Sequence, residues 1–403
     1  MKNLIIFYKI AFLSVCAIAI TSCSERKSDK DIRVIDVAGA VGTGRIIDLS
    51  EIAKDINYIP LETTDSSLVG TMYSLVYEAG HIYVRDDEKS VKIFDSTGRY
   101  VRTINRCGRG PEEYTNIFNF HVIPHNGNIT VLTGSGTIME YDIFGNFVSK
   151  VVKPDLKEYH IVGGLKMAEN LYVASVFKSG DVGEFCAIVY DSLSDVKLKI
   201  PNPDYHTGEL SVNSSGWGVV KAPSLSQFGN NIRMLHRDIQ MDTVYSINAG
   251  MKLERPFVFD YGAYKEPSDS KLDISDNSKY IKLIGILVES ADYLFLWFNF
   301  RGLSKEPMEN GRGHVVAMYD KNISELSLLN QPVKGKMGFK DDIEGGPVFW
   351  PRTVSSQEYL VAAYTAVSFM EFAQNDDCSK KIKDLATGLN ENDNPVVALV
   401  KLK

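Results

Sequence analysis

The stretch GHIYVRDDEKSVKIFDSTGRYVRTINRCGRGPEEY, residues 80–114, is the part of the chain that decides the fold. Apolar and polar side chains alternate in VKIFD and in YVRTI, and a short Ser-Thr-Gly turn separates the two runs. Alternation with a period of two is typical of half-buried strands. The pattern therefore predicts antiparallel strands over 74–78, 82–85, 90–95 and 99–104, followed by a glycine-rich exit loop.

The same order of strands recurs further along the chain in less regular copies. Three of these copies keep a Tyr-Asp corner before a turn, at Tyr141-Asp142, Tyr190-Asp191 and Tyr319-Asp320. Successive copies are about 40 to 60 residues apart, the range expected for four-stranded propeller blades. The five further copies span residues 118–152, 160–200, 222–261, 281–330 and 345–403.

The last copy supplies only about three strands, whereas residues 45–61 hold strand material that belongs to no copy. A closed ring has no free strand edge. We therefore expect this N-terminal strand to pair with the C-terminal PVVALVKLK. The predicted fold is an all-β, six-bladed β-propeller of four-stranded antiparallel blades over residues 45–403. Within the last copy, EYLVAAYTAVSFM is assigned to strand, and residues 375–389 predict a short helix in a loop.

The N-terminal residues 1–22 have the features of an export signal, because Lys2 and Lys9 flank an apolar start and an apolar run follows. The signal ends in Ile20-Thr21-Ser22-Cys23, which resembles the bacterial lipobox. That resemblance implies a lipid on Cys23, with residues 23–44 as a tether. The alternative is an ordinary secretory signal that is cleaved nearby.

The charge of the chain limits the classes of partner. The formal net charge is −7, and removal of the two lysines in residues 1–22 leaves −9. Phosphate binding needs clustered Lys and Arg, so we expect no nucleic-acid partner. The cysteines that follow Cys23 in the chain, Cys107, Cys186 and Cys378, form no disulfide framework and no metal-binding spacing. We expect no cofactor and no metal, although a calcium ion held in a central channel stays open.

Aromatic residues are the better candidates for a binding site, and the catalytic residues stay unknown. Trp217 lies in a polar loop, and Trp350 lies beside Arg352 in GGPVFWPR. A tryptophan beside a cation offers a flat apolar face with polar edges to a sugar or peptide. The alternative is that both tryptophans pack between blades, as we expect of Trp297. The loop GRGPEEY lacks the lysine of a phosphate-binding loop and is interpreted as a turn between blades.

Residues 80–114 resemble a repeat of NHL or TolB-like six-bladed propellers. Together with the lipobox-like end of the signal, IPLETT at 59–64 and FWP at 349–351, the chain resembles exported propeller lipoproteins of Gram-negative bacteria. The resemblance implies a location in the cell envelope with a lipid anchor, in the outer membrane, on either of its sides. Most members of that group have no assigned activity.

Three functions follow as alternatives. The first is a binding or scaffolding module for a glycan, a peptide or an outer-membrane protein partner. The second is an enzyme, a lyase or hydrolase with a site in the channel, with calcium as a possible aid. The third is a structural subunit of an uptake complex. Convergent carboxylates, histidines or arginines at the channel mouth would favour the enzyme, and an aromatic mouth with few charges would favour binding.

Overall fold

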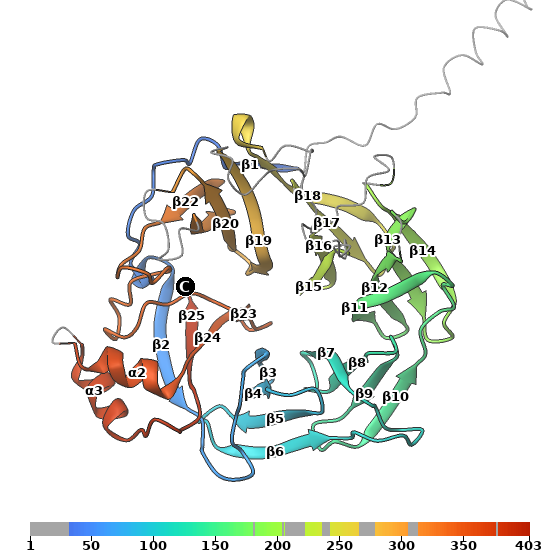
Figure 1. Ribbon diagram of the computed structural model, residues 1–403, viewed down its shortest axis with the longest axis horizontal. Coiled ribbons are helices and arrows are strands. Elements are labelled where there is room, and N and C mark those ends of the chain that lie inside the picture. The colour runs from blue at the N-terminus through green and yellow to red at the C-terminus, as the bar shows by residue number, and fades with distance from the viewer. Residues whose placement is uncertain are drawn as a thin grey trace, which may run out of the picture. The chain divides into compact units, whose positions relative to one another are not determined.

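Six antiparallel sheets form the ring of a six-bladed β-propeller, as the repeats predict (Figure 1). The computed structural model describes residues 32–179, 182–203, 205, 222–235, 242–265, 279–304, 313–375 and 378–403. The unit Val34–Lys403 holds the ring and is compact. Strands that follow one another within a blade run from the centre of the ring to its outside, where strands from the N-terminal part of the chain are added to two of the blades.

The strands of the first blade agree with the predicted ones to within about one residue, since their alternation is the most regular. Blade 1 contains β3 (Ser74–Glu78), β4 (His81–Arg85), β5 (Ser90–Asp95) and β6 (Tyr100–Asn105). Blade 2 contains β7 (Ile117–Val122), β8 (Ile129–Thr133), β9 (Ile138–Tyr141) and β10 (Phe147–Val151). Blade 3 contains β11 (Tyr159–Ala168), β12 (Leu171–Lys178), β13 (Phe185–Asp191) and β14 (Val196–Pro201).

The other three blades complete the ring in chain order. Blade 4 contains β15 (Ser224–Phe228), β16 (Asn231–Leu235), β17 (Thr243–Asn248) and β18 (Leu253–Asp260). Blade 5 contains β19 (Tyr280–Glu289), β20 (Tyr293–Arg301), β21 (His314–Asp320) and β22 (Glu325–Leu329). Blade 6 contains β23 (Thr353–Val354), β24 (Tyr359–Tyr364), β25 (Val396–Leu402) and β2 (Ala53–Pro60).

The ring closes through β2, which is the outer strand of blade 6 and pairs antiparallel with β25. Ile56 lies opposite Val400 in this register, and both side chains are buried. The predicted pairing of the N-terminal strand with the C-terminal segment is therefore confirmed. Because the strands come from opposite ends of the fold, the last blade forms only when nearly the whole chain is present.

The folded unit begins earlier in the chain than the sequence pattern indicates. The strand β1 (Arg33–Asp36) adds a fifth strand to blade 4, beside β18, inside the stretch 23–44 that the sequence analysis treats as a tether. Ile35 and Val37 are buried there. A four-residue strand that belongs to no repeat carries too little alternation to be recognised from sequence.

The segment after β24 departs from the prediction, because it is a helix and not a strand. The strand ends at Tyr364, and α2 spans Ala366–Ala373. Thr365 caps this helix, since its side chain accepts a hydrogen bond from the backbone N–H of Ser368. The predicted helix near the C-terminus is present as α3 (Lys380–Thr387). Both helices lie in the connection between β24 and β25.

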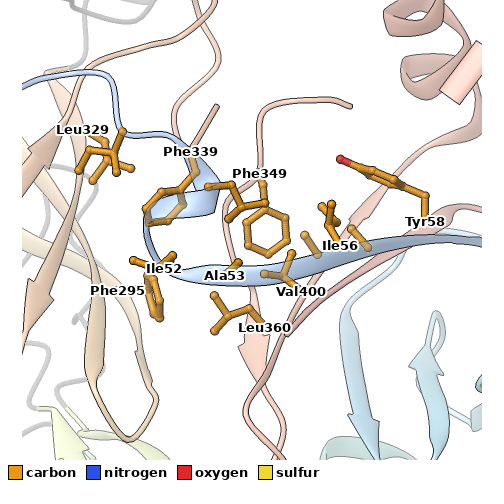
Figure 2. Packing of buried hydrophobic residues seen from close by; sticks show 14 of the residues in the cluster. Ile52, Ala53, Ile56, Tyr58, Phe295, Leu329, Phe339, Phe349, Leu360 and Val400 are labelled. Carbon is orange, nitrogen blue, oxygen red and sulfur yellow. The ribbon is translucent and has the colours of Figure 1, made fainter. Parts of the chain in front are cut away.

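Blades 5 and 6 share the largest set of buried apolar residues in the described chain, drawn partly from the loop that joins them (Figure 2). Phe339 and Phe349 from this loop are fully buried against Ile52 and Phe295. The same loop is fixed by Asp341, whose carboxylate accepts a hydrogen bond from the Tyr58 hydroxyl at 2.8 Å. The connection between the two blades is therefore part of the core.

The GRGPEEY loop joins blade 1 to blade 2, as predicted. The Glu113 carboxylate accepts a hydrogen bond from the backbone N–H of Gly110 at 2.8 Å and holds the turn. Tyr114 is buried, and its hydroxyl donates to the carbonyl oxygen of Lys89 at 2.8 Å. The glycines and the acidic side chain thus shape a crossing between blades.

Candidate functional site

The candidate site is a cavity of about 930 Å³ where the innermost strands of all six blades end. The C-terminal ends of the six inner strands, with the turns that follow them, meet at one opening of the ring. The residues with charged or hydrogen-bonding side chains that line the cavity are Glu78, His121, His125, Lys166, Glu169, Gln227, Asn230, Glu289, Ser355, Ser356 and Glu358.

Short connections place these residues at the opening, because each inner strand turns back into the second strand of its blade after two to six residues. The turn after β3 uses Gly80 and the turn after β15 uses Gly229, both with positive φ angles, at 74° and 54°. Glycine adopts such angles without a steric penalty. The inner strands therefore end within a narrow zone, and the polar residue at each end faces the same space.

Two carboxylates at the opening link blade 6 to its neighbours. The Glu78 side chain accepts hydrogen bonds from the Ser356 hydroxyl at 2.5 Å and from the Ser356 backbone N–H at 2.9 Å, which joins blade 1 to blade 6. The Glu358 carboxylate accepts from the backbone N–H of Ala291 at 3.0 Å and so joins blade 6 to blade 5. These carboxylates therefore contribute to ring closure.

A buried ion cluster links blade 4 to blade 5 beside the same cavity. Arg233 from β16 donates from Nε to the Glu289 carboxylate at 2.7 Å, and the Lys321 ammonium donates to it at 2.8 Å. Arg233 also donates to the hydroxyl of Ser246 at 2.5 Å. Both cations lie over the ring of Phe228, which lines the cavity. Two cations share one carboxylate here, and the cluster carries a net positive charge.

Blades 2 and 3 are joined by a further ion pair at the cavity wall. The Lys166 ammonium donates to the Glu140 carboxylate at 2.7 Å, and the Asn128 amide donates to the other carboxylate oxygen at 2.7 Å. Blades 1 and 2 are joined by the Tyr83 hydroxyl, which donates to the carbonyl oxygen of Gly127 at 3.2 Å. Most of the charged groups near the cavity thus have structural hydrogen bonds between blades.

The side chains of His121 and Gln227 differ from those groups, because they join no neighbouring blades. Burial lowers the pKa of His121 to about 4, and an interaction with the Gln227 side chain raises it only in part. The imidazole is therefore neutral at pH 7 and keeps one donor and one acceptor nitrogen. The amide oxygen of Gln227 is buried and has no hydrogen-bond partner of good geometry. Because both side chains line the cavity, this wall offers neutral hydrogen-bonding groups to a ligand.

The lowered pKa of His121 predicts a loss of stability in acid. Below its ordinary pKa of 6.5 the unfolded chain binds a proton that the folded chain does not bind until the pH reaches about 4. We expect this residue to lower the free energy of unfolding by about 1 to 3 kcal/mol between pH 6.5 and 4. Urea unfolding of the wild type and of His121→Asn at pH 7 and at pH 4.5 measures the difference, and parallel losses in the two proteins would contradict it.

The residues that the sequence analysis proposed as a site do not line this cavity where the structure describes them. Trp350 is half-buried, and its ring stacks on Phe339 and meets the edge of Phe295 at centroid distances of 5.9 Å in both pairs. Arg352 is exposed, and its backbone N–H donates to Val361. Cys23 and Trp217 lie outside the described residues. Trp297 is 37% exposed, so the expectation that it packs wholly between blades is wrong.

The ring contacts of Trp350 predict a stability role that can be measured. Truncation to alanine would remove the stacking on Phe339 and leave a gap beside the core of blades 5 and 6. We expect Trp350→Ala to lower the free energy of unfolding by about 2 to 4 kcal/mol. Denaturant unfolding measures this loss. A stability within about 0.5 kcal/mol of the wild type would contradict the packing role and return Trp350 to the candidate recognition surface.

The cavity residues were not recognised from sequence, although a signal for them exists. His121 and His125 fall in and just after an inner strand, as Lys166 and Glu169 do in the next blade. Polar residues at the end of the first strand of each repeat would have identified the opening. Within the described ranges, no group of three or more His, Cys, Asp or Glu side chains is placed to hold a metal ion.

Comparison with solved structures shows the class of fold. A solved structure of a protein from Bacteroides fragilis NCTC 9343, whose description proposes that it is exported, matches with a TM-score of 0.67 and 19% identity over 92% of this chain and 99% of that chain. A member of the DUF4221 family from Bacteroides vulgatus matches with a TM-score of 0.48 and 10% identity, over 87% of this chain and 97% of that one. The likeness to the Bacteroides fragilis protein shows a shared fold.

The particular family follows from the sequence. The chain belongs to the family described as "Domain of unknown function (DUF4934)", whose model matches residues 32–401. No curated protein matches the sequence. In the part of the chain that the structure describes, none of the helices is long and apolar enough to span a membrane.

Proposed function

We propose that this chain is a lipoprotein of the bacterial cell envelope that binds a polar ligand in the channel cavity. The anchor is the lipid on Cys23, at the end of the lipobox-like sequence. The ligand is a glycan, a peptide or an exposed segment of a partner protein. The similarity to a Bacteroides protein described as exported supports a location outside the cytoplasm.

One observation carries the choice of binding over catalysis. The opening is charged, which by itself favours an enzyme. However, the carboxylates of Glu78, Glu289 and Glu358 each accept hydrogen bonds from a neighbouring blade. A general acid or base must be within reach of the proton that it transfers and must change its charge during the reaction. Carboxylates that hold the ring together are poorly suited to that role and well suited to a rigid binding pocket.

An array of glycans and peptides tests the proposal, with the chain from Ser24 to Lys403 as the analyte. We expect reproducible binding that is weakened by Gln227→Leu, which removes the buried amide oxygen at similar volume, and unchanged by Leu193→Ser, since Leu193 lies on an exposed turn outside the cavity. Binding that is insensitive to Gln227→Leu, or an array without reproducible ligands, would contradict the proposed function.

The enzyme alternative is retained for one observation, the neutral imidazole of His121 in the cavity wall. A neutral histidine can accept a proton from a bound substrate. Array ligands should therefore be incubated with the protein and analysed by mass spectrometry. New products that disappear in His121→Asn would favour a lyase or hydrolase, and unchanged ligands would favour binding alone.

A further inference from the structure

The charges around the cavity do not balance. The charged lining residues and their direct ion-pair partners comprise five carboxylates, of Glu78, Glu140, Glu169, Glu289 and Glu358, and three cations, of Lys166, Arg233 and Lys321. With His121 neutral, two negative charges remain in excess. The three cations are already engaged with Glu140 and Glu289.

The excess negative charge lies on both sides of the blade 6 turn, with Glu78 at the link to blade 1 and Glu358 at the link to blade 5. Glu78 is 6% exposed, and its hydrogen bonds to Ser356 come from neutral donors. Glu358, two residues after Ser356, accepts only from a backbone N–H among the contacts of the described residues. Burial raises the pKa values of Tyr77 and Tyr83, and the negative charge of Glu78 adds to both shifts. A carboxylate out of water without a cation partner costs free energy, and a bound cation would offset that cost.

The hydrogen-bonding groups of the opposite wall also favour a ligand that donates hydrogen bonds. The buried amide oxygen of Gln227 can only accept, and the carboxylate of Glu169 can only accept when ionised. A ligand that donates hydrogen bonds fits both walls. A negatively charged ligand would meet like charges at Glu78 and Glu358 and would be repelled.

We propose that the cavity selects ligands that carry a positively charged amine, which the Glu78 and Glu358 carboxylates bind on one wall while the Gln227 amide oxygen accepts a hydrogen bond on the other. This inference rests on the proposed function, because it names the ligand class of the same cavity. Apolar lining residues, among them Ile123, Met167 and Phe228, contact the rest of the ligand.

Two matched pairs of small molecules test the charge preference by isothermal titration. Glucosamine and N-acetylglucosamine share a sugar ring and differ in the charge on nitrogen, and 1,5-diaminopentane and 1,5-pentanediol share a chain length. We expect the amine of each pair to bind at least tenfold more tightly, with an affinity that falls as salt is added. The sugar pair and the linear pair distinguish an amino-sugar source from a simple amine or lysine-like source.

Variants locate the effect. We expect Glu358→Gln and Glu78→Gln each to weaken amine binding about tenfold and to leave pentanediol binding unchanged, whereas Glu325→Gln, at an exposed position of β22, should change neither. Glu169 takes no part in the hydrogen bonds between blades described above. Glu169→Gln therefore tests the effect of charge in a variant that keeps those hydrogen bonds. Thermal melting of each variant separates loss of folding from loss of affinity.

The outcomes distinguish the inference from the function on which it rests. Equal or tighter binding of the neutral member of each pair, or failure of all four probes, would overturn the amine preference. Array ligands that still depend on Gln227 would then leave the proposed binding function in place. An array without Gln227-dependent ligands would overturn the binding function, whatever the small amines do.

Discussion

Deletion of residues 396–403 should abolish cooperative folding of the whole chain and not of one blade. The deleted strand β25 lies between β2 and β24 in the sheet of blade 6, so its loss leaves β2 without a partner and opens the ring. Five buried Val and Leu side chains leave with it, of Val396, Val397, Leu399, Val400 and Leu402. Each contributes about 1.5 to 3 kcal/mol, which together is comparable to the total stability of about 5 to 15 kcal/mol of a typical protein.

Calorimetry measures this effect directly. We expect the main melting transition of the truncated chain to disappear or to fall by more than about 15 °C. Removal of the exposed Lys403 alone is the matched control, with a transition close to that of the wild type. A melting transition that is the same with and without β25 would show that the ring does not depend on this closure.

The second large effect is expected for Glu289→Ala, at the centre of the buried ion cluster. The substitution leaves the Arg233 guanidinium and the Lys321 ammonium buried without their shared carboxylate. Breaking a buried ion pair by removing one partner costs about 3 to 5 kcal/mol, because the remaining charge is uncompensated. We expect a loss of this size in denaturant unfolding.

Two controls separate burial from charge. Glu51→Ala breaks the Arg45–Glu51 ion pair, whose side chains are 53% and 40% exposed, and should cost less than about 1 kcal/mol. Replacement of Glu289, Arg233 and Lys321 together by methionine removes all three charges and should recover most of the lost stability. Equal losses for Glu289→Ala and Glu51→Ala would contradict the role assigned to the buried cluster.

The parts of the fold that the sequence predicts are those set by local pattern. Alternation around Ser90–Asp95 and the turn at Gly98 place blade 1 to within about one residue, and the unpaired strands at the two ends of the chain predict the closure. The strand β1 and helix α2 were not predicted. Four residues give β1 too little pattern, and the alternating apolar residues of α2 conceal the Thr365 cap.

The candidate site could not be predicted from sequence because it depends on contacts between distant residues. Arg233 and Glu289 are 56 positions apart, and Glu78 and Ser356 are 278 positions apart. No motif spacing links such residues, and only the common direction of the inner strands brings them to one opening. Tryptophans attract attention in a sequence, but the ring of Trp350 is engaged by Phe339 and Phe295 and lies outside the cavity.

A chemical block of the cavity tests the central claim most directly. In a Cys107→Ser background, which removes the exposed thiol, Asn230→Cys places a reactive thiol in the cavity wall, and Leu193→Cys places one on a turn outside it. Each protein is labelled with a bulky maleimide and applied to the glycan and peptide array. Labelling at position 230 should abolish binding and labelling at position 193 should leave it intact. Undiminished binding with a fully labelled cavity would contradict the claim that the ligand binds there.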